Sequence, residues 1–496
     1  MKRLFKGLRD RPAESYDAVI IGAGIGGLVT ANLLARDGLK VLLVEQHYMV
    51  GGYCSTFRRG GYLFDAATHF YPLLGNPGTF TGRLLQELGV ETRWIRMDPV
   101  DVFHLPDGSR FEVPVDLDTY LLQVKGWFPD EAAAIDRFFQ TVREAYSAGL
   151  IQHFRGRPTR PAAWSDWSVR DALDHFFLDE RLKLLLTADC AHWGSPPKRT
   201  SFVFDSMLRL AYFLGNYYPV GGSQAFADEL ARTFEERGGH VLTSARATRI
   251  VTGNQRAKGV ELEILRGAHR GPVSVGAGVV VSNADLKLTV DELLRDVALA
   301  PEWRSWPSEM TPSFPCFLTH LGLQGVDPHA LERAQGYYWN SWDPDLVGQN
   351  GLRCKIFVPT LLEPALAPEG AQIVILQKVL DPEMFGEPAR RDPLGHKQAV
   401  EDYVVAHLES VVPGATAAIR TKTSASAWTS ERFTLNLGGA MLGWEMSPEQ
   451  VKARPPLAGP LENLYLVGHW TRPGGGITPV IASALEVASR VGRSES

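Results

Sequence analysis

The sequence contains few cysteines, and they follow no pattern. Its 496 residues include only Cys54, Cys190, Cys316 and Cys354, which lie far apart and form no C-x-x-C pair. This spacing excludes a disulfide-rich scaffold and does not match the clustered ligands of a structural zinc site. We therefore expect reduced thiols, as in a cytoplasmic protein, and no metal centre.

A large excess of charge of one sign is also missing. The formal net charge is -5 and the isoelectric point is near 6.3. Nucleic-acid-binding proteins concentrate basic residues on one face, so this class of function is excluded. The basic N-terminus is not followed by the apolar run of about 7–15 residues that a cleaved secretory signal needs. Residues 2–11 mix basic side chains with Leu4, Phe5 and Leu8, which predicts a membrane-surface helix or a solvated arm.

Long apolar runs are scarce, and one uncharged stretch, residues 18–35, has the ~18-residue length of a membrane span. It contains four glycines within six positions and is flanked directly by Asp17 and Arg36. These features favour a buried strand and helix of a soluble domain.

That same region carries the most informative motif. Gly22, Gly24 and Gly27 form G-x-G-x-x-G between a predicted strand and a helix, and Glu45 follows Gly24 by 21 residues. In such a unit the first glycine permits the tight turn, the second admits a pyrophosphate and the third allows close helix–strand packing. The acidic residue reaches the adenosine ribose. The sequence therefore predicts a dinucleotide site.

A second glycine-rich loop follows a strand near the end of the chain. Gly468 begins it, and Pro473-Gly474-Gly475-Gly476 precede a predicted helix. Such a helix start offers backbone amides to another electronegative part of a cofactor. Two sites at opposite ends of the chain favour a long cofactor, FAD rather than NAD.

The remaining patterns divide the chain. Residues from about 130 to 214 are helical in pattern, with a predicted helix start at Ser168 and Asp171. The predicted organisation is an FAD-binding domain of residues 12–75, 217–295 and 455–492, a substrate-binding domain of residues 76–129 and 296–454, and a helical cap of residues 130–216. The segment 202–218 is apolar enough either to dip into a membrane or to pack inside the cap.

Several stretches resemble the phytoene-desaturase-like flavoproteins, in particular their carotenoid-isomerase and retinol-saturase branch. The resemblance is carried by VEQHYMVGGYCSTFRRGGYLFDAATHFY, YPVGGSQAFADEL, VVVSNAD and LVGHWTRPGGGITPVIASALEVA, in that order. It implies an α/β fold in which a Rossmann-like FAD-binding domain is interleaved with a mixed α+β substrate domain and a helical cap. It also implies an FAD oxidoreductase acting on a conjugated isoprenoid.

By the same resemblance, individual residues acquire expected roles toward FAD. The pyrophosphate is expected on Gly22, Gly24 and Gly27, and the adenosine ribose on Glu45 and its neighbour Gln46. The flavin approach is assigned to Gly51, Gly52 and Arg59, adenine to the strand around Ala247, and the ribitol and flavin edge to Gly468, His469, Gly476 and Ile477. His469 departs from the family pattern, which often has Asp there, so acceptance from ribitol hydroxyls by a carboxylate is lost.

Proton transfer during the redox chemistry needs a general acid or base. The sequence offers His69 and His469 as catalytic candidates, with Asp65 and His192 as further candidates that structural roles explain as well. Aromatic residues are expected to line a tunnel for an apolar polyene: Phe70, Tyr71, Tyr212, Phe213, Tyr217, Tyr218, Tyr337, Tyr338, Trp339 and Trp342.

Two other functions stay open at this point. A flavin amine oxidase acting on a soluble substrate has the same fold and requires an aromatic cage. A non-enzymatic isoprenoid carrier also has it, without flavin, although the complete glycine motif and Glu45 weigh against that. Desaturation, saturation and cis–trans isomerisation of the polyene are not separated, peripheral membrane association stays open, and the oligomeric state is not predicted.

Overall fold

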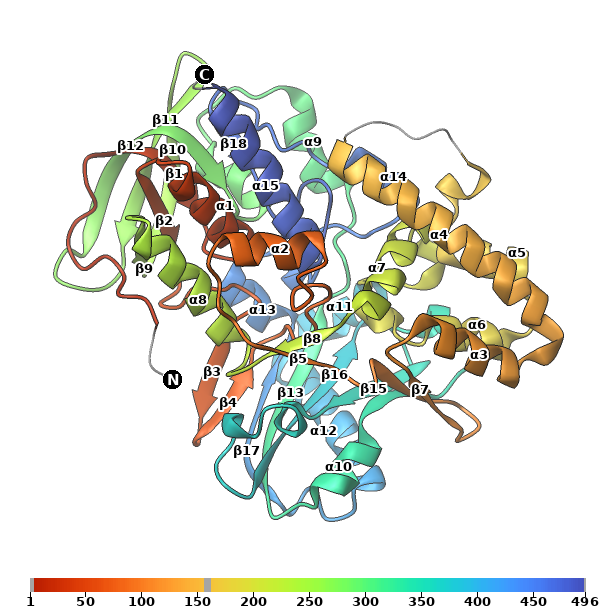
Figure 1. Cartoon of the computed structure of the whole chain (residues 1–496). Helices are drawn as coiled ribbons and strands as arrows, with labels where there is room; N and C mark the ends of the chain where they lie inside the picture. Colours follow the sequence, from red (N-terminus) through yellow and green to blue (C-terminus); the bar gives the residue numbers. More distant parts are fainter. Residues whose placement is uncertain (1–3, 156–161, 495–496) are drawn as a thin grey trace.

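The computed structural model describes residues 4–155 and 162–494 and is built around two large sheets, with helices on their outer faces (Figure 1). The first sheet has the strand order β10-β11-β12-β1-β2-β9, and β18 also pairs with β12. Its members are β1 (Ser15–Ile21), β2 (Val41–Glu45), β9 (His240–Thr243), β10 (Ala245–Gly253), β11 (Arg256–Ile264), β12 (Gly271–Ser282) and β18 (Leu464–Leu466).

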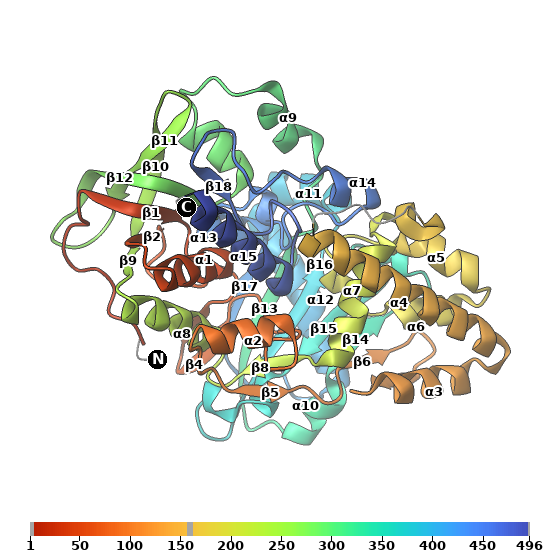
Figure 2. The ribbon, with the colours of Figure 1, turned by 45° about the horizontal axis from the view of Figure 1, so that its top comes forward.

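The centre of this first sheet is parallel. β1 pairs in parallel with both β2 and β12, and its apolar residues 18–20 are fully buried. Parallel sheets need helices on their faces. Here α1 (Ile25–Arg36) packs against α15 (Ile477–Ser494) on one side and α8 (Ser223–Glu236) on the other. Figure 2 shows α1 and α15 side by side. Segments from the start, middle and end of the chain thus form one α/β unit.

The second sheet has the order β17-β13-β16-β15-β14-β6-β7 and is antiparallel except for β14 and β6. Its strands are β6 (Asp101–His104), β7 (Arg110–Val113), β13 (Cys316–Gln324), β14 (Gly336–Trp339), β15 (Leu352–Phe357), β16 (Ala371–Val379) and β17 (Ile419–Ala425). Both predicted substrate-domain segments therefore contribute strands to it. The exact domain boundaries stay a prediction.

Two short ribbons connect the sheets. One is the hairpin of β3 (Thr56–Arg59) and β4 (Tyr62–Asp65), and the other pairs β5 (Trp94–Arg96) with β8 (Tyr217–Pro219). The buried Asp65 carboxylate accepts from Thr56 Oγ1 at 2.8 Å, from the Ser223 amide at 2.9 Å and from the Tyr218 hydroxyl. It thereby ties the hairpin to the start of α8.

Helices α4 to α7 form the cap on the right of Figure 1. They are α4 (Ala132–Arg155), α5 (Val169–Phe176), α6 (Glu180–Thr187) and α7 (Phe202–Leu214). The predicted start of α5 is confirmed, because Ser168 and Asp171 form a capping box. The other α-helices are α2 (Phe80–Glu87), α3 (Leu117–Trp127), α9 (Pro301–Glu309), α10 (Pro328–Ala334), α11 (Pro382–Arg391), α12 (Pro393–Val411), α13 (Ala427–Thr434) and α14 (Pro448–Ala453).

Helix α7 packs against α4 inside the cap. It carries a buried ion pair, in which Arg209 donates from Nη2 to Asp205 Oδ1 at 2.9 Å and from Nε to Oδ2 at 3.2 Å. A buried pair of this kind fits a protein interior better than an inserted segment. Among the described residues, no helix is both long and apolar enough to cross a bilayer.

The N-terminal arm is neither a membrane-surface helix nor fully solvated. Residues 4–14 form no helix, and the Leu8 amide donates to the Val241 carbonyl at 2.7 Å. Phe5 is buried in the hydrophobic core of the first sheet. The backbone amides on its two sides, of Leu4 and Lys6, donate to Asp228 and Glu235 of α8 and hold this part of the arm in place. Lys2 and Arg3 lie outside the described residues. The prediction of a membrane helix here is wrong for residues 4–14.

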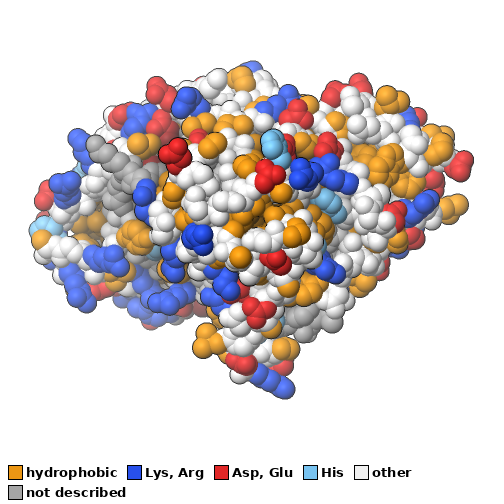
Figure 3. All heavy atoms as spheres, turned by 90° about the horizontal axis from the view of Figure 1, so that it is seen from below, with side chains coloured by type: hydrophobic (Ala, Val, Ile, Leu, Met, Phe, Trp, Pro, Cys, Tyr) orange, Lys and Arg blue, Asp and Glu red, His pale blue; other side chains and the backbone are white. Residues whose placement is uncertain are grey.

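The face seen in Figure 3 carries acidic and basic side chains intermixed, with hydrophobic side chains between them. This mixture agrees with the small net charge of the whole chain. An extended field of one sign, as nucleic-acid binding requires, is not visible on this face.

Candidate functional site

A large cavity, of about 1550 Å³, connects the glycine-rich turn after β1 with the second sheet and the cap. It exceeds the ~300–1,000 Å³ of ordinary small-molecule sites. Most of the predicted cofactor residues line it, namely Gly22, Gly24, Glu45, Gln46, Gly51, Gly52, Arg59, Ala247, Gly468, His469, Gly476 and Ile477. The catalytic candidates His69 and His192 line it too, whereas Gly27 and Asp65 do not.

The turn after β1 is built to receive an anion. Helix α1 begins after Gly24 with no side-chain cap and no acidic residue in its first turn. Its first amides therefore point to the cavity without an intrahelical partner, as at other phosphate-binding helix starts. Gly27 has a different function, since a Cβ there would lie 2.0 Å from the Gly22 carbonyl oxygen. The expected packing role of Gly27 agrees with this close approach, while its contact with pyrophosphate stays a prediction, since Gly27 does not line the cavity.

Glu45 closes the other side of this cradle. Its Oε2 accepts from the Ala23 amide and its Oε1 from the His47 amide, both at 2.8 Å. Burial raises the pKa of Glu45, and these two amides oppose that rise. Because both oxygens are held in place and keep free lone pairs, the carboxylate can accept from a ribose diol.

Three distant loops meet beside α1. Gly51 donates its amide to the Ala23 carbonyl at 2.7 Å, so the loop after β2 lies against the glycine-rich turn. Gly468 comes so close to Asn283 that a Cβ would lie 2.7 Å from Asn283 Oδ1. Sequence reasoning did not assign a role to Asn283. Its position directly after a buried strand parallel to β1 is the signal that would have identified it.

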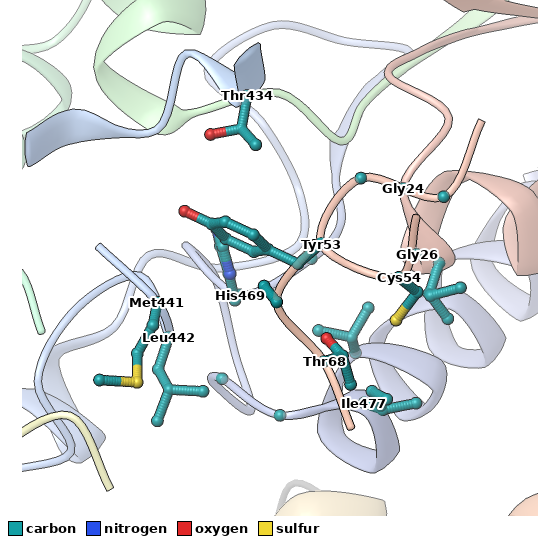
Figure 4. Close-up of a pocket in the computed structure, with 18 of the residues that line it drawn as sticks. Gly24, Gly26, Tyr53, Cys54, Thr68, Thr434, Met441, Leu442, His469 and Ile477 are labelled. Carbon is teal, nitrogen blue, oxygen red and sulfur yellow. The ribbon is translucent and has the colours of Figure 1, made fainter. Parts of the chain in front are cut away.

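The close-up in Figure 4 shows Tyr53 and His469 at the junction between the cradle and the loop before α15, with Met441 and Leu442 opposite. Burial lowers the pKa of His469 to about 3, with the Arg454 charge as the second cause, so the imidazole is neutral. Its Nε2 lies 3.2 Å from Asn436 Oδ1, an acceptor, and therefore donates. The other nitrogen, Nδ1, is then an acceptor.

These features fit FAD. The uncapped start of α1 suits a pyrophosphate, and the fixed carboxylate of Glu45 suits the adenosine ribose. The glycine-rich loop before α15 lines the same cavity. A dinucleotide with a bulky ring system is the group that uses all three.

His69 lies in the loop after β4 and lines the cavity where it borders the second sheet. Its Nδ1 donates to the Ala67 carbonyl at 2.9 Å, and its ring stacks on Phe357 with centroids 4.7 Å apart. Burial, followed by the positive charge of Lys355, lowers the pKa of His69 to about 3. The neutral ring therefore has its proton on Nδ1, and Nε2 is a buried acceptor without a partner.

A cluster of buried polar side chains lies behind this wall. Lys355 Nζ donates to the Tyr337 hydroxyl at 3.0 Å and lies 3.4 Å from Asp101 Oδ1. His192 lies 2.6 Å from the same hydroxyl through Nε2. Burial lowers the pKa of Lys355 to about 8 and lowers that of His192 further below its usual value. His192 thus belongs to a polar cluster and is more than a packed loop residue.

The rest of the cavity is apolar and comes from the cap. The lining residues from α4 and α7 are Tyr146, Leu150, Phe204, Met207, Leu208, Ala211, Tyr212 and Leu214. Of the ten aromatic residues expected in a tunnel, only Phe70 and Tyr212 line it; the other eight lie in the core or beside it. Five of them lie on β8 and β14, and no residue of these two strands lines the cavity, which periodicity alone did not reveal.

Neither metal nor thiol chemistry has support among the described residues. They contain no group of His, Cys, Asp and Glu able to hold a metal ion. Cys54 and Cys316 line the cavity, but burial raises their thiol pKa values to about 11 and about 12. Thiols with such pKa values are protonated and poor nucleophiles near neutral pH.

Three known proteins show the range of names among the relatives of this chain. Prolycopene isomerase 2 of an Oncidium hybrid cultivar is 27% identical over 97% of this chain and 84% of its own length. Phytoene desaturase (neurosporene-forming) of Cereibacter sphaeroides is 26% identical over 95% and 94%. All-trans-retinol 13,14-reductase of Danio rerio is 28% identical over 67% and 58%.

Solved structures share the fold at lower identity. An oxidoreductase from Methanosarcina mazei superposes with a TM-score of 0.69 over 95% of this chain and 99% of its own, at 17% identity. A putrescine oxidase variant gives 0.67 over 97% and 100%, at 15% identity. The expected α/β architecture, with its FAD-binding domain, mixed substrate domain and cap, is confirmed.

The family model described as flavin containing amine oxidoreductase matches residues 25–492, nearly the whole chain. The matched range begins directly after Gly24 and includes Gly27, Glu45 and the loop before α15. The resemblance to phytoene-desaturase-like proteins is confirmed by the relatives as well. The chain therefore belongs to the flavin containing amine oxidoreductases and is an oxidoreductase with FAD as its cofactor.

Proposed function

We propose that this FAD-dependent oxidoreductase acts on a conjugated isoprenoid, a carotenoid- or retinoid-like polyene, by desaturation, saturation or cis–trans isomerisation. The observation that carries the proposal is the continuity of the cavity. The cofactor cradle of Gly24 and Glu45 opens into an arm whose walls are the apolar faces of α4 and α7. A rod-like hydrocarbon chain suits such an arm, because burying its surface contributes about 25 cal/mol per Å².

Flavin supplies a hydride acceptor or donor, which no side chain provides. The protein binds, orients and handles protons. We assign proton transfer to His69, whose neutral ring lines the cavity and whose proton lies on Nδ1, toward the Ala67 carbonyl. His469 is assigned to holding the cofactor side of the cavity, because its Nε2 is committed to Asn436.

The relatives support the substrate class. Their names specify prolycopene, phytoene and all-trans-retinol, all of them polyenes, with an isomerase, a desaturase and a reductase among them. At 26–28% identity the three reactions are equally compatible with this chain.

Two observations weigh against the alternatives. A cationic amine would lose its hydration in the apolar arm, where Leu150, Phe204 and Leu208 offer no hydrogen-bond acceptor. A carrier without flavin has no use for the uncapped start of α1 or for a half-buried carboxylate held in place at Glu45.

The cavity mouth supports peripheral membrane contact, where such substrates dissolve. Phe80 and Leu214 both line the cavity and are 40% and 45% exposed, so the cavity reaches the surface between α2 and α7. Asn76 connects the two sides, since its Nδ2 donates to the Leu214 carbonyl at 2.8 Å. An apolar rim of this kind lets an apolar molecule enter without crossing water.

The test uses FAD-loaded protein, oxidised in one series and reduced in another, incubated with carotenoids and retinoids. Mass spectrometry distinguishes the loss of two mass units, the gain of two, and an unchanged mass with an altered absorbance spectrum. We expect one of these for at least one polyene. Turnover of soluble amines with no effect on any polyene would overturn the proposal while leaving the flavoprotein assignment intact.

A further inference from the structure

Arg454 is a buried arginine without an acidic partner among the described residues. Its side chain is 1% exposed, and its guanidinium donates only to neutral groups. Nη1 donates to the His469 carbonyl at 2.9 Å, and Nη2 donates to the Trp444 carbonyl at 2.8 Å. Nη2 also reaches the Glu445 carbonyl at 3.2 Å, but the carboxylate of Glu445 pairs with Arg199 instead, at 2.9 Å.

This guanidinium is charged. Burial lowers the pKa of Arg454 to about 9, which still leaves the side chain protonated near neutral pH. A charge buried without an opposite charge is unfavourable, and a neutral donor would tie the same carbonyls together without that cost. The hydrogen bonds alone therefore do not account for an arginine at this position.

The glycine-rich loop before α15 lies between this charge and the cavity. At Gly474 a Cβ would come within 3.1 Å of Arg454 Cζ, so the loop backbone rests directly on the guanidinium. The next residues, Gly475 and Gly476, line the cavity, as does His469. The charge acts at this wall, because it is the second cause, after burial, that lowers the pKa of His469 to about 3.

The start of α15 adds to the positive field at the same place. This helix begins at Ile477, directly after the loop, and has no acidic residue in its first turn. A helix N-terminus carries a partial positive charge. The two acidic residues that line the cavity, Glu45 and Asp285, follow other strands and accept from backbone amides there. The end of the cavity where the flavin edge is expected is therefore electropositive.

We propose that Arg454 is the counter-charge for the negative charge that bound FAD gains on reduction, so that the protein binds reduced FAD more tightly than oxidised FAD. A hydride donor delivers two electrons and one proton to a flavin, and the product is an anion unless a second proton is taken up from water. A fixed positive charge behind the loop favours the anion. This inference concerns the cofactor and does not depend on the identity of the substrate.

The experiment measures the midpoint potential of FAD in the loaded full-length protein, by dithionite titration with a redox dye of known potential. Arg454→Met removes the charge and keeps an unbranched side chain in its place. We expect the ratio of affinities for reduced over oxidised FAD to fall at least about tenfold, which lowers the potential by about 30 mV. Arg454→Lys keeps the charge and should keep this ratio within about threefold of the wild type.

The matched control is Arg472→Met. Arg472 is an exposed arginine of the same loop that does not line the cavity, and its Nε donates to the backbone carbonyl of Arg454 at 3.4 Å. Water screens an exposed charge, so we expect the wild-type potential. Titration of each apoprotein with oxidised FAD, followed by flavin fluorescence, gives the affinity of the oxidised state separately.

The absorbance spectrum of the reduced wild type is a second measurement that needs no variant. The near-ultraviolet absorbance of a reduced flavin differs between its neutral and anionic forms. At pH 6 we expect the anion in the protein, whereas free reduced FAD, measured alongside, is mostly neutral. A neutral form in the protein would overturn the proposal even if Arg454→Met does not fold.

The variants give equally clear results. An unchanged potential in Arg454→Met overturns the proposal, and so does an equal decrease in Arg472→Met. A decrease in Arg454→Lys as large as in Arg454→Met would assign the effect to the lost hydrogen bonds. Equal weakening of oxidised and reduced FAD would place the charge at the pyrophosphate instead. All these measurements are made without a polyene, so none of them bears on the proposed substrate class.

Discussion

Asn283, the residue that follows β12, donates from Nδ2 to the Gly22 carbonyl at 3.2 Å. Its Oδ1 occupies the space next to Gly26 and Gly468, where a Cβ would come within 2.5 Å and 2.7 Å of it. One side chain thus joins the turn after β1 to the loop near the C-terminus. Both loops line the cofactor end of the cavity.

Asn283→Asp tests this connection. It keeps the shape of the side chain but replaces the NH₂ donor with an acceptor and adds negative charge beside the expected pyrophosphate. We expect the Kd for FAD to rise by at least about tenfold, from loss of a hydrogen bond and from repulsion. Titration of the apoprotein with FAD, followed by flavin fluorescence, measures this. Asn254→Asp, in an exposed turn, is the matched control, and an equal effect there would contradict the assignment.

Glu45→Gln tests the ribose contact. In the glutamine variant, an NH₂ group replaces one of the two carboxylate oxygens of Glu45. This NH₂ then faces another donor, the backbone N–H of either Ala23 or His47. Losing a charge-assisted hydrogen bond costs about 1.5–3 kcal/mol, so FAD should bind about ten- to a hundredfold more weakly. Flavin content after purification and FAD titration give the answer. Glu87→Gln, exposed on α2, should bind FAD normally; unchanged occupancy in Glu45→Gln would refute this role.

Arg209→Met tests the buried ion pair in α7. Removing the arginine leaves Asp205 buried without its partner, which typically costs about 3–5 kcal/mol. The pKa of Asp205 is already raised to about 6 by burial, and it should rise further in the variant. The loss in unfolding free energy should therefore be largest at pH 8 and smaller at pH 5, where Asp205 is protonated. Urea unfolding at both pH values measures it.

The double variant Asp205→Asn with Arg209→Met is the internal check. Because it removes the isolated charge as well, it should recover part of the stability at pH 8 and show little pH dependence of the loss. A double variant as unstable as Arg209→Met at pH 8 would mean that the arginine acts through packing alone.

His320 is expected to contribute to the pH dependence of stability. It is buried on β13, donates from Nε2 to the Asp65 carbonyl at 2.9 Å, and burial lowers its pKa to about 4. The unfolded value is about 6.5. The folded state therefore excludes a proton that the unfolded state binds. The contribution is complete above about pH 6.5 and is lost as the pH falls toward 4, at about 1.4 kcal/mol per pH unit.

His320→Gln keeps a donor for the Asp65 carbonyl but does not titrate. Between pH 6.5 and 4.5 its unfolding free energy should depend less steeply on pH than that of the wild type. Urea unfolding at intervals of half a pH unit measures the slopes. His329→Gln, on the exposed surface of α10, should keep the wild-type slope. Parallel slopes for His320→Gln and the wild type would contradict the assigned protonation.

Leu214→Ser tests the apolar rim of the cavity mouth. If the rim contacts a bilayer, the variant should co-sediment less with phosphatidylcholine vesicles than the wild type, while FAD occupancy is retained. Leu178→Ser is the control, because Leu178 is 91% exposed on the cap and does not line the cavity. An equal decrease for both variants would point to general surface hydrophobicity instead of the mouth.

Local patterns were sufficient for the cofactor end of the site. The turn at Gly22, the helix after it and the acid at Glu45 are neighbours in sequence, and their spacing follows from strand and helix geometry. The capping box at Ser168 is equally local. Gly27 shows the limit even here. Its packing role was recognised, but whether it also faces the cavity depended on the position of the Gly22 carbonyl.

The substrate end could not be read in the same way. His192 resembles a packed loop histidine in the sequence, yet its ring centroid lies 4.4 Å from that of Phe70. Its Nε2 contacts the hydroxyl of Tyr337, which is 145 residues away in the sequence. Which aromatic side chains face the cavity depends on how the cap and the second sheet are oriented. Strand periodicity indicates two faces and does not say which one faces the ligand.

The sequence by itself determined the family, the cofactor and the βαβ unit that binds it, because backbone geometry restricts the residues around a pyrophosphate to a short, ordered motif. Only the tertiary structure decided how the Gly468 loop closes on Asn283, that His69 and Gln377 share one wall, and that Lys355 stands behind it. The reason is physical. These contacts join strands far apart in the chain, and their burial, which sets the protonation of His69 and Lys355, exists only after the two sheets and the cap have packed.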